Sequence, residues 1–124
     1  MPSEEIVRQD WTRKLHVFSR EHNGWIVSVH VVDPSGREQT EVRTLPLHGV
    51  SIDDPGKTRV AITVGHGGNG HFTHEISEPV RILVERTDAG ADRGLSIRAA
   101  DGSTTSVEFL SPMRPEEVDG LPHV

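Results

Sequence analysis

The sequence contains no cysteine, no tyrosine and only two lysines among its 124 residues. The absence of cysteine excludes disulfide bonds, thiolate zinc sites and thiol nucleophiles. No apolar run approaches the roughly 18 to 20 residues that a membrane-spanning helix needs. The opening segment, MPSEEIVRQDW, lacks the basic and apolar regions of a secretory signal peptide. The sequence therefore predicts a soluble protein of the cytoplasm that makes no contact with membranes.

A concentration of positive charge is also missing. The chain carries 13 basic and 19 acidic residues, a net charge of -6, and both signs are scattered along it. Because nucleic acids and anionic surfaces attract basic patches, we expect no nucleic-acid partner. The length is that of one domain, with no room for a catalytic domain beside a binding domain.

An amphipathic helix is predicted from about residue 10 to residue 23. The side chains that share its apolar face, at spacings of four, three and four residues, are Trp11, Leu15, Phe18 and His22. Asp10 can cap the helix start, and Gly24 can supply the left-handed stop. We expect this face to be buried, with His22 at the boundary of the core.

From residue 25 to about residue 110, apolar residues recur at every second position, which is typical of β-strands. Turn sequences between the strands favour meander connections. The predicted fold class is mainly β (α+β), with the helix packed on an antiparallel sheet of six or seven strands. The sheet is expected to form either a partly closed barrel or a two-layer sandwich. Residues 1–110 are expected to form one globular domain, and residues 111–124 a mobile C-terminal tail.

Strand register can also be predicted, because a slip of one residue would turn the apolar side chains to the wrong face. An odd-length loop centred on Gly68 pairs Ile62 with His74. This register places His74 on the core side of its strand, where we expect a buried ring bonded to a backbone carbonyl.

Two further hairpins follow from the same reasoning. A three-residue loop that ends in a left-handed Gly102 pairs Leu95 with Val107. A four-residue turn in the first hairpin pairs Val29 with Thr40. Pro46 is expected to bend or end the strand that contains it, because proline has no N–H for the ladder.

Three ordered strings stand out: WTRKLHVFSREHNGW from Trp11 to Trp25, LPLHG from Leu45 to Gly49, and THEISEPV from Thr73 to Val80. Through these strings the chain, from about Ile6 to Phe109, resembles an uncharacterised family of small, largely bacterial proteins known as a domain of unknown function. The resemblance implies a shared fold and a housekeeping or stress-linked bacterial setting. It implies no activity and no site residues.

The Gly- and His-rich segment 65–74 is the one candidate for chemistry. Its first six residues match G-x-G-x-x-G, but the alternation that follows predicts a strand where a dinucleotide site needs a helix. A hairpin loop is therefore favoured over a phosphate cradle. The candidate ligand-binding residues are His66, Asn69 and His71, of which the two histidines could share a metal ion with a carboxylate from elsewhere. No metal, cofactor or catalytic residue is predicted outright.

Two functional hypotheses remain. The first is a non-catalytic binding or protein-interaction domain, whose partner is another protein or a second copy of the chain, since its strands leave edges that can pair. The second is a protein that binds a metal ion or small ligand, or a minor enzyme, and uses the segment 65–74.

Overall fold

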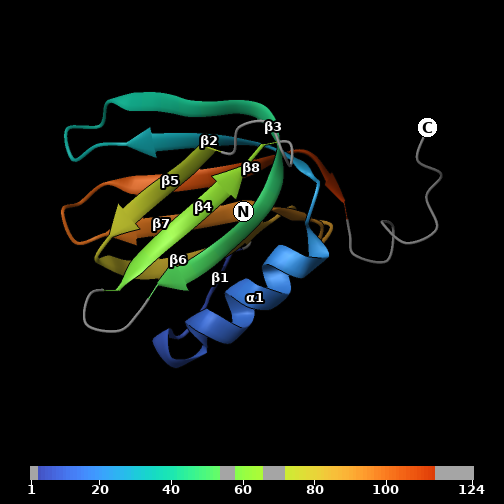
Figure 1. Cartoon of the computed structure of the whole chain (residues 1–124), viewed down its shortest axis with the longest axis horizontal. Coiled ribbons are helices and arrows are strands. Elements are labelled where there is room, and N and C mark those ends of the chain that lie inside the picture. Colours follow the sequence, from blue (N-terminus) through green and yellow to red (C-terminus); the bar gives the residue numbers. More distant parts are fainter. Residues whose placement is uncertain (1–2, 54–57, 66–71, 114–124) are drawn as a thin grey trace.

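The computed structural model describes residues 3–53, 58–65 and 72–113. This part of the chain forms one α-helix, one short 3-10 turn and eight strands (Figure 1). In chain order the elements are β1 (Ser3–Glu5), the 3-10 turn η1 (Arg8–Asp10), α1 (Trp11–Glu21), β2 (Ile26–Val32), β3 (Glu38–Asp53), β4 (Arg59–Val64), β5 (Phe72–Ser77), β6 (Pro79–Arg86), β7 (Asp92–Ala99) and β8 (Thr104–Met113).

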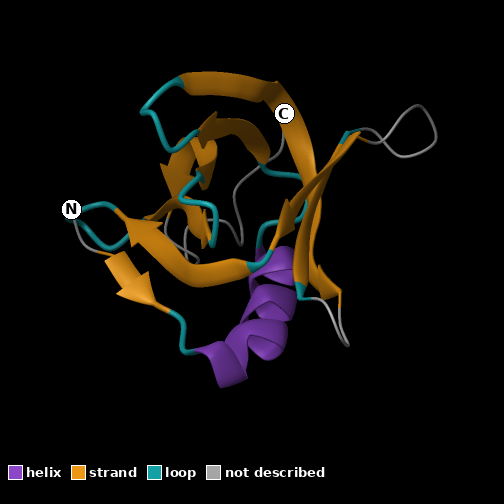
Figure 2. Cartoon of the chain, turned by 90° about the vertical axis from the view of Figure 1, so that its left-hand side faces the viewer, coloured by secondary structure: helices purple, strands orange, loops and turns teal. Residues whose placement is uncertain are grey.

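The strands form one antiparallel sheet in the order β1-β6-β7-β8-β2-β3-β4-β5. Two meanders, β6 to β8 and β2 to β5, are joined where β8 pairs with β2. The sheet is curved and open, and α1 lies across its open side (Figure 2). The predicted class, mainly β with an N-terminal helix on an antiparallel sheet, is confirmed. The strand count reaches eight because β1, with three residues, is too short to show any alternation.

The long strand β3 belongs to both halves of the sheet. Its residues 38–46 pair with β2, and its residues 47–53 pair with β4. The change of partner falls at Pro46, which has no N–H for a ladder. Close by, Thr44 has a φ of 47°, in the left-handed region. The strand therefore bends where the sequence predicts a bend or an end.

Helix α1 packs on the sheet through the predicted face. The side chains of this face that are buried are Trp11, Leu15, Phe18 and His22. Gly24 has a φ of 89° and ends the helix as predicted. The Asp10 side chain makes no capping hydrogen bond and instead lies 3.2 Å from the Arg13 guanidinium. In the described part of the chain, no helix is long and apolar enough to cross a membrane.

Two of the three predicted hairpin registers are confirmed. Ile62 pairs with His74 in the β4–β5 hairpin. Leu95 pairs with Val107 in the β7–β8 hairpin, and Gly102 has a φ of 94°.

The register predicted for the β2–β3 hairpin is wrong. Thr40 lies opposite His30, not opposite Val29. The reason is that Gly36 adopts a left-handed φ of 91°, so the loop closes over three residues and not four. Val29 still meets an apolar partner, Val42, because a register shift follows between residues 29 and 30.

The expected burial of His74 is wrong as well. Its side chain is 19% exposed, and its Nδ1 lies 3.8 Å from Glu41 Oε1, so that its partner is a carboxylate and not a backbone carbonyl. The pairing was correct, but β5 lies at an edge of the sheet. An inward side chain on an edge strand has a neighbouring strand on one side only and is covered less completely.

The C-terminal boundary falls later than the expected position at residue 110. Strand β8 runs to Met113. The tail predicted for residues 111–124 therefore begins inside β8, and its residues 114–124 lie outside the described residues.

Candidate functional site

The three ligand-binding residues predicted from the sequence, His66, Asn69 and His71, lie outside the described residues. The segment that follows them, Phe72–Ser77, is strand β5. A dinucleotide fingerprint needs a helix at that place, so the structure supports the prediction that the glycines do not form one. Within residues 3–53, 58–65 and 72–113, no group of three or more His, Asp or Glu side chains could hold a metal ion.

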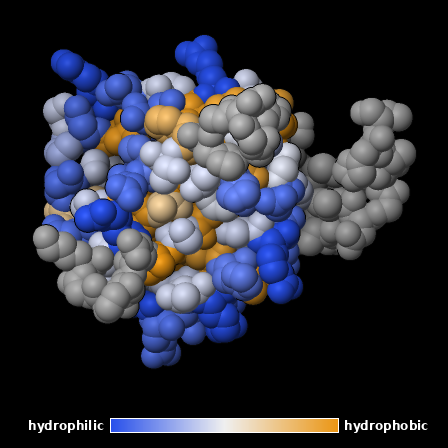
Figure 3. All heavy atoms as spheres, viewed as in Figure 1, coloured by the Kyte–Doolittle hydropathy of each residue, from blue (hydrophilic) through white to orange (hydrophobic). Residues whose placement is uncertain are grey.

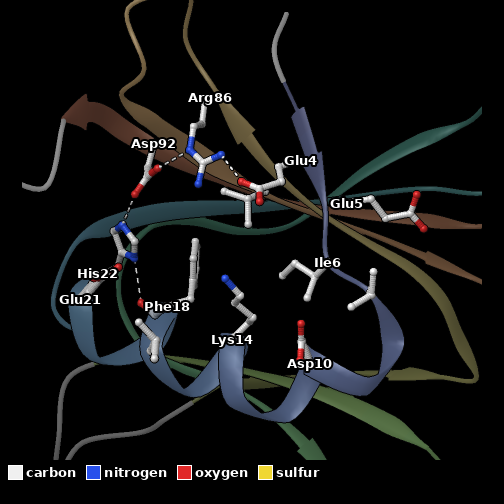
Figure 4. Close-up of a pocket in the computed structure, with 13 residues that line it drawn as sticks. Glu4, Glu5, Ile6, Asp10, Lys14, Phe18, Glu21, His22, Arg86 and Asp92 are labelled. Atoms are coloured by element: carbon white, nitrogen blue, oxygen red, sulfur yellow. Dashed lines mark hydrogen bonds and ion pairs between the residues drawn. The ribbon is translucent and has the colours of Figure 1, made fainter.

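A cleft of about 310 Å³ lies between α1, β6 and the segment that runs from β1 into η1 (Figure 4). Apolar and charged side chains line it together. Those that matter below are Glu4, Lys14, Phe18, His22, Arg86 and Asp92. Lys14 points its ammonium group into the cleft from the middle of α1 (Figure 4).

His22 lines this cleft at the C-terminus of α1, and its side chain is 2% exposed. Its Nδ1 is 2.7 Å from the Phe18 carbonyl oxygen, and its Nε2 is 2.9 Å from Asp92 Oδ2. The ring packs against Phe18, Trp25 and Phe109, with centroids 4.4, 4.5 and 4.7 Å away. The Phe18 carbonyl oxygen and the Asp92 carboxylate are both hydrogen-bond acceptors, so each ring nitrogen of His22 faces an acceptor.

A chain of charged groups leads from His22 to the first strand. Asp92, the first residue of β7, is 9% exposed at its side chain. Its Oδ1 accepts a hydrogen bond from Arg86 Nε at 3.3 Å, and Arg86 Nη1 donates to Glu4 Oε1 at 2.7 Å. These contacts connect α1, β7, β6 and β1 (Figure 4).

The charges in this chain stabilise one another. Burial raises the pKa of the Asp92 carboxyl, but the hydrogen bond and charge of His22, together with Arg86, outweigh burial and leave the pKa below its ordinary value. The hydrogen bond from Arg86 lowers the pKa of Glu4. The same bond to Glu4 raises the pKa of Arg86. At neutral pH these three groups are therefore ionised.

The His22–Asp92 pair resembles a catalytic dyad in its composition but not in its access. A general base needs a free nitrogen lone pair within reach of the substrate, and both nitrogens of His22 already lie within hydrogen-bond distance of a partner inside the chain. Among the described residues that line the cleft there is no Ser, Thr or Cys to serve as a nucleophile. The pair therefore fastens the end of α1 to the sheet.

The outer edge of β5 is the second feature that could bind a partner. In the described part of the chain, β5 pairs with β4 on one side and with no strand on the other. The side chains along it that are exposed are Phe72, Thr73, Glu75 and Ser77. Figure 3 shows the face on which β4 and β5 lie, where hydrophilic residues surround a central strip of hydrophobic ones. An unpaired edge can accept another strand through its backbone.

A comparison with protein families matches residues 2–118 to the model of one family. The chain belongs to DUF5335, a family of unknown function. No curated protein and no solved structure matches the chain. Membership in DUF5335 therefore confirms the resemblance drawn from the sequence and assigns no activity.

In this member of DUF5335, Ser19 fastens α1 to β3. The Ser19 hydroxyl lies 2.8 Å from both the Leu15 and the Val50 carbonyl oxygens, and it accepts a hydrogen bond from the Val50 N–H at 2.8 Å. Gly49 faces the same hydroxyl, and a Cβ there would lie 3.6 Å from it. Both residues belong to the strings on which the resemblance to the family rests, so those strings include residues that join helix and sheet.

Sequence reasoning missed the partners of His22. The sequence predicts a boundary residue, whereas the structure buries His22 inside the core, beside Asp92. One signal was present: a histidine on the apolar face of a helix needs a polar partner wherever it is buried. The identity of that partner was out of reach, because Asp92 lies 70 residues further along the chain.

Proposed function

We propose that this protein is a non-catalytic interaction domain that binds an extended protein segment along the outer edge of β5. The edge itself carries the proposal, since its backbone is open over six residues in the described part of the chain. Binding by strand addition takes affinity from backbone hydrogen bonds and specificity from alternate side chains. On β5 these alternate side chains include the exposed Phe72 on one side and Thr73 and Glu75 on the other.

The other edge of the sheet is less suited to this role. Strand β1 has three residues, and ion pairs hold it to β6: Glu5 to Arg81 at 3.0 Å and Glu4 to Arg86 at 2.7 Å. Short strands and charged side chains are the means by which proteins protect a sheet edge from further pairing. Strand β5 is twice as long, and its middle residue Glu75 makes a looser ion pair with Arg59 at 3.7 Å.

Selection from a random peptide library tests the proposal. Peptides selected on the wild type should bind a Glu75→Pro variant at least about tenfold more weakly, because proline removes an N–H that faces the partner. A proline at Glu85 would disrupt β6, which lies inside the sheet, and so cannot serve as the control. The control is therefore Glu85→Gln, which should leave peptide binding unchanged. Equal binding of the selected peptides to the wild type and to a folded Glu75→Pro variant would overturn the proposal.

A second candidate function is the binding of a metal ion or small ligand by the loop between β4 and β5. The pairing of Val64 with Phe72 holds the two ends of this loop side by side, and His66, Asn69 and His71 lie in the sequence between them. Elemental analysis of protein purified without an affinity tag tests this candidate. It fails if no metal copurifies and if His66→Ala combined with His71→Ala leaves the melting shift by zinc or nickel unchanged.

The cellular setting is part of the proposal. We propose that the protein acts in the cytoplasm and that its partner is a protein and not a nucleic acid, in keeping with a net charge of -6 and no basic run. Fractionation of the native host with an antibody to the protein tests the location. Recovery in the membrane or secreted fraction would contradict it.

A further inference from the structure

We infer that the strand that pairs with β5 is β5 of a second copy of this chain, in an antiparallel register centred on His74. This inference rests on the proposed function. This pairing joins two sheets across a two-fold axis, the commonest symmetry of soluble dimers. The inference rests on three observations: the direction of the backbone groups of β5, the match of its side chains, and the charges along it.

The backbone groups that point away from β4 can be identified from the ladder. In an antiparallel pair, the N–H and C=O groups of alternate residues point to the same neighbour. The Glu78 N–H donates to the Thr58 carbonyl at 3.2 Å, and the same alternation pairs Ile76 with Val60. Even-numbered residues therefore face β4. The residues whose backbone groups face the free side are Thr73, Glu75 and Ser77.

The side chains of two such strands complement each other. With the axis at His74, Phe72 lies opposite Ile76 of the partner subunit on the core-facing side, and Thr73 lies opposite Glu75 of the partner subunit. Phe72 is 41% exposed in the single chain. Pairs of an aromatic and a β-branched side chain stabilise neighbouring strands, so the dimer would cover an apolar side chain that the single chain leaves in water.

Charge favours this register over its neighbour. Moving the axis to Glu75 would set two Glu75 carboxylates directly opposite each other, which is destabilising. With the axis at His74, each Glu75 faces a threonine and keeps its ion pair with Arg59 at 3.7 Å. The two His74 rings that meet at the axis each have Glu41 at 3.8 Å, so each ring has a carboxylate beside it.

The expected dimer is weak. Two six-residue strands bury much less than the roughly 800 Å² per partner of a standard interface. Association should therefore depend on concentration in the micromolar range or above, and the experiment must detect a small population of dimer.

Cysteine crosslinking tests the register directly, because the chain has no cysteine of its own. In a His74→Cys variant, two copies of residue 74 would face each other in a non-hydrogen-bonded pair, with Cα atoms about 4.5 Å apart, within the range for a disulfide. In the control, Ser77→Cys, the two cysteines would lie six positions apart along the strands, about 20 Å. Under mild oxidation His74→Cys should form at least about tenfold more covalent dimer than Ser77→Cys. The inference would be overturned if the two variants formed equal amounts of covalent dimer, or if neither formed any.

Sedimentation velocity of the wild type and of Glu75→Pro provides a second measurement. The wild type should show concentration-dependent dimerisation that Glu75→Pro abolishes, while the circular dichroism spectrum of the variant stays that of the wild type. A wild type that stays monomeric at the highest attainable concentration overturns the second-copy partner. The peptide selection described above is scored separately, so binding there by a monomeric wild type would leave the proposed function standing.

Discussion

The two edges of the sheet differ in how they are closed. Strand β1 is short, and through Glu4 it joins the charged chain that runs by way of Arg86 and Asp92 to the buried His22. Strand β5 is longer and is held by β4 alone among the described strands. Ion pairs and hydrogen bonds thus connect the β1 edge to the core, whereas the β5 edge presents backbone groups that no described strand pairs.

This difference separates stability from binding. Side chains at the β1 edge are engaged within the chain, so substitutions there should change the free energy of unfolding. Side chains at the β5 edge are engaged weakly, so substitutions there should change association and leave unfolding nearly unchanged. The predictions below test this separation, starting with the largest expected effect.

Asp92→Ala should destabilise the fold by about 3 to 5 kcal/mol, because it removes the buried carboxylate that contacts both His22 Nε2 and Arg86 Nε. Urea unfolding followed by tryptophan fluorescence measures the loss. The matched control is Asp88→Ala, an exposed residue of the turn that precedes β7, which should change the free energy of unfolding little. A loss below about 1 kcal/mol for Asp92→Ala would mean that the charged chain does not hold the β1 edge.

Acid pH should lower the stability that Asp92 contributes to the fold. Since the folded-state pKa of Asp92 is lowered, the stability that its carboxylate contributes is complete above the unfolded-state pKa of about 3.9. That stability is lost as the pH falls through the lower folded-state pKa. Urea midpoints of the wild type and of Asp92→Asn, measured from neutral pH downward, should therefore converge at acid pH. A constant difference between them across this range would contradict the assignment.

Glu4→Gln should cost at most about 1 kcal/mol, because the Glu4 carboxylate is 62% exposed and its pair with Arg86 is screened by water. Amide hydrogen exchange in β1 should become faster, while exchange in β7 and β8 should not. Glu85→Gln serves as the control, since Glu85 makes no ion pair with any described residue. Unchanged exchange in β1 would show that backbone pairing with β6 is sufficient to hold the strand.

Glu75→Gln should have the smallest effect, below about 0.5 kcal/mol at a concentration where the protein is monomeric, because its ion pair with Arg59 is long and exposed. Thermal melting in dilute solution measures this effect. A larger loss would show that the β5 edge contributes to the fold of the single chain and would remove the contrast between the two edges.

Much of the fold follows from local patterns. The buried face of α1 and two hairpin registers could be predicted because apolar periodicity fixes which side chains point inward. The β2–β3 register failed on one left-handed glycine, Gly36, whose conformation the residue type permits but does not require.

The candidate sites were harder to predict. The charged chain joins residues that are up to 82 positions apart, and a single sequence gives no sign of such contacts. The exposure of His74 depended on the position of β5 at an edge, which follows from the order of strands and not from the hairpin. Local pattern thus gave the pairing of β5 but not the neighbours it lacks.

The shared strand β3 has a consequence for how the molecule unfolds. Its first half pairs with β2, and its second half pairs with β4. If one half of the sheet unfolds, the other half therefore loses hydrogen bonds that β3 makes. The fold should consequently lose its structure in one step, with equal calorimetric and van't Hoff enthalpies. A proline at the position where β3 changes partner thus lies inside a single cooperative unit and does not divide the chain into two.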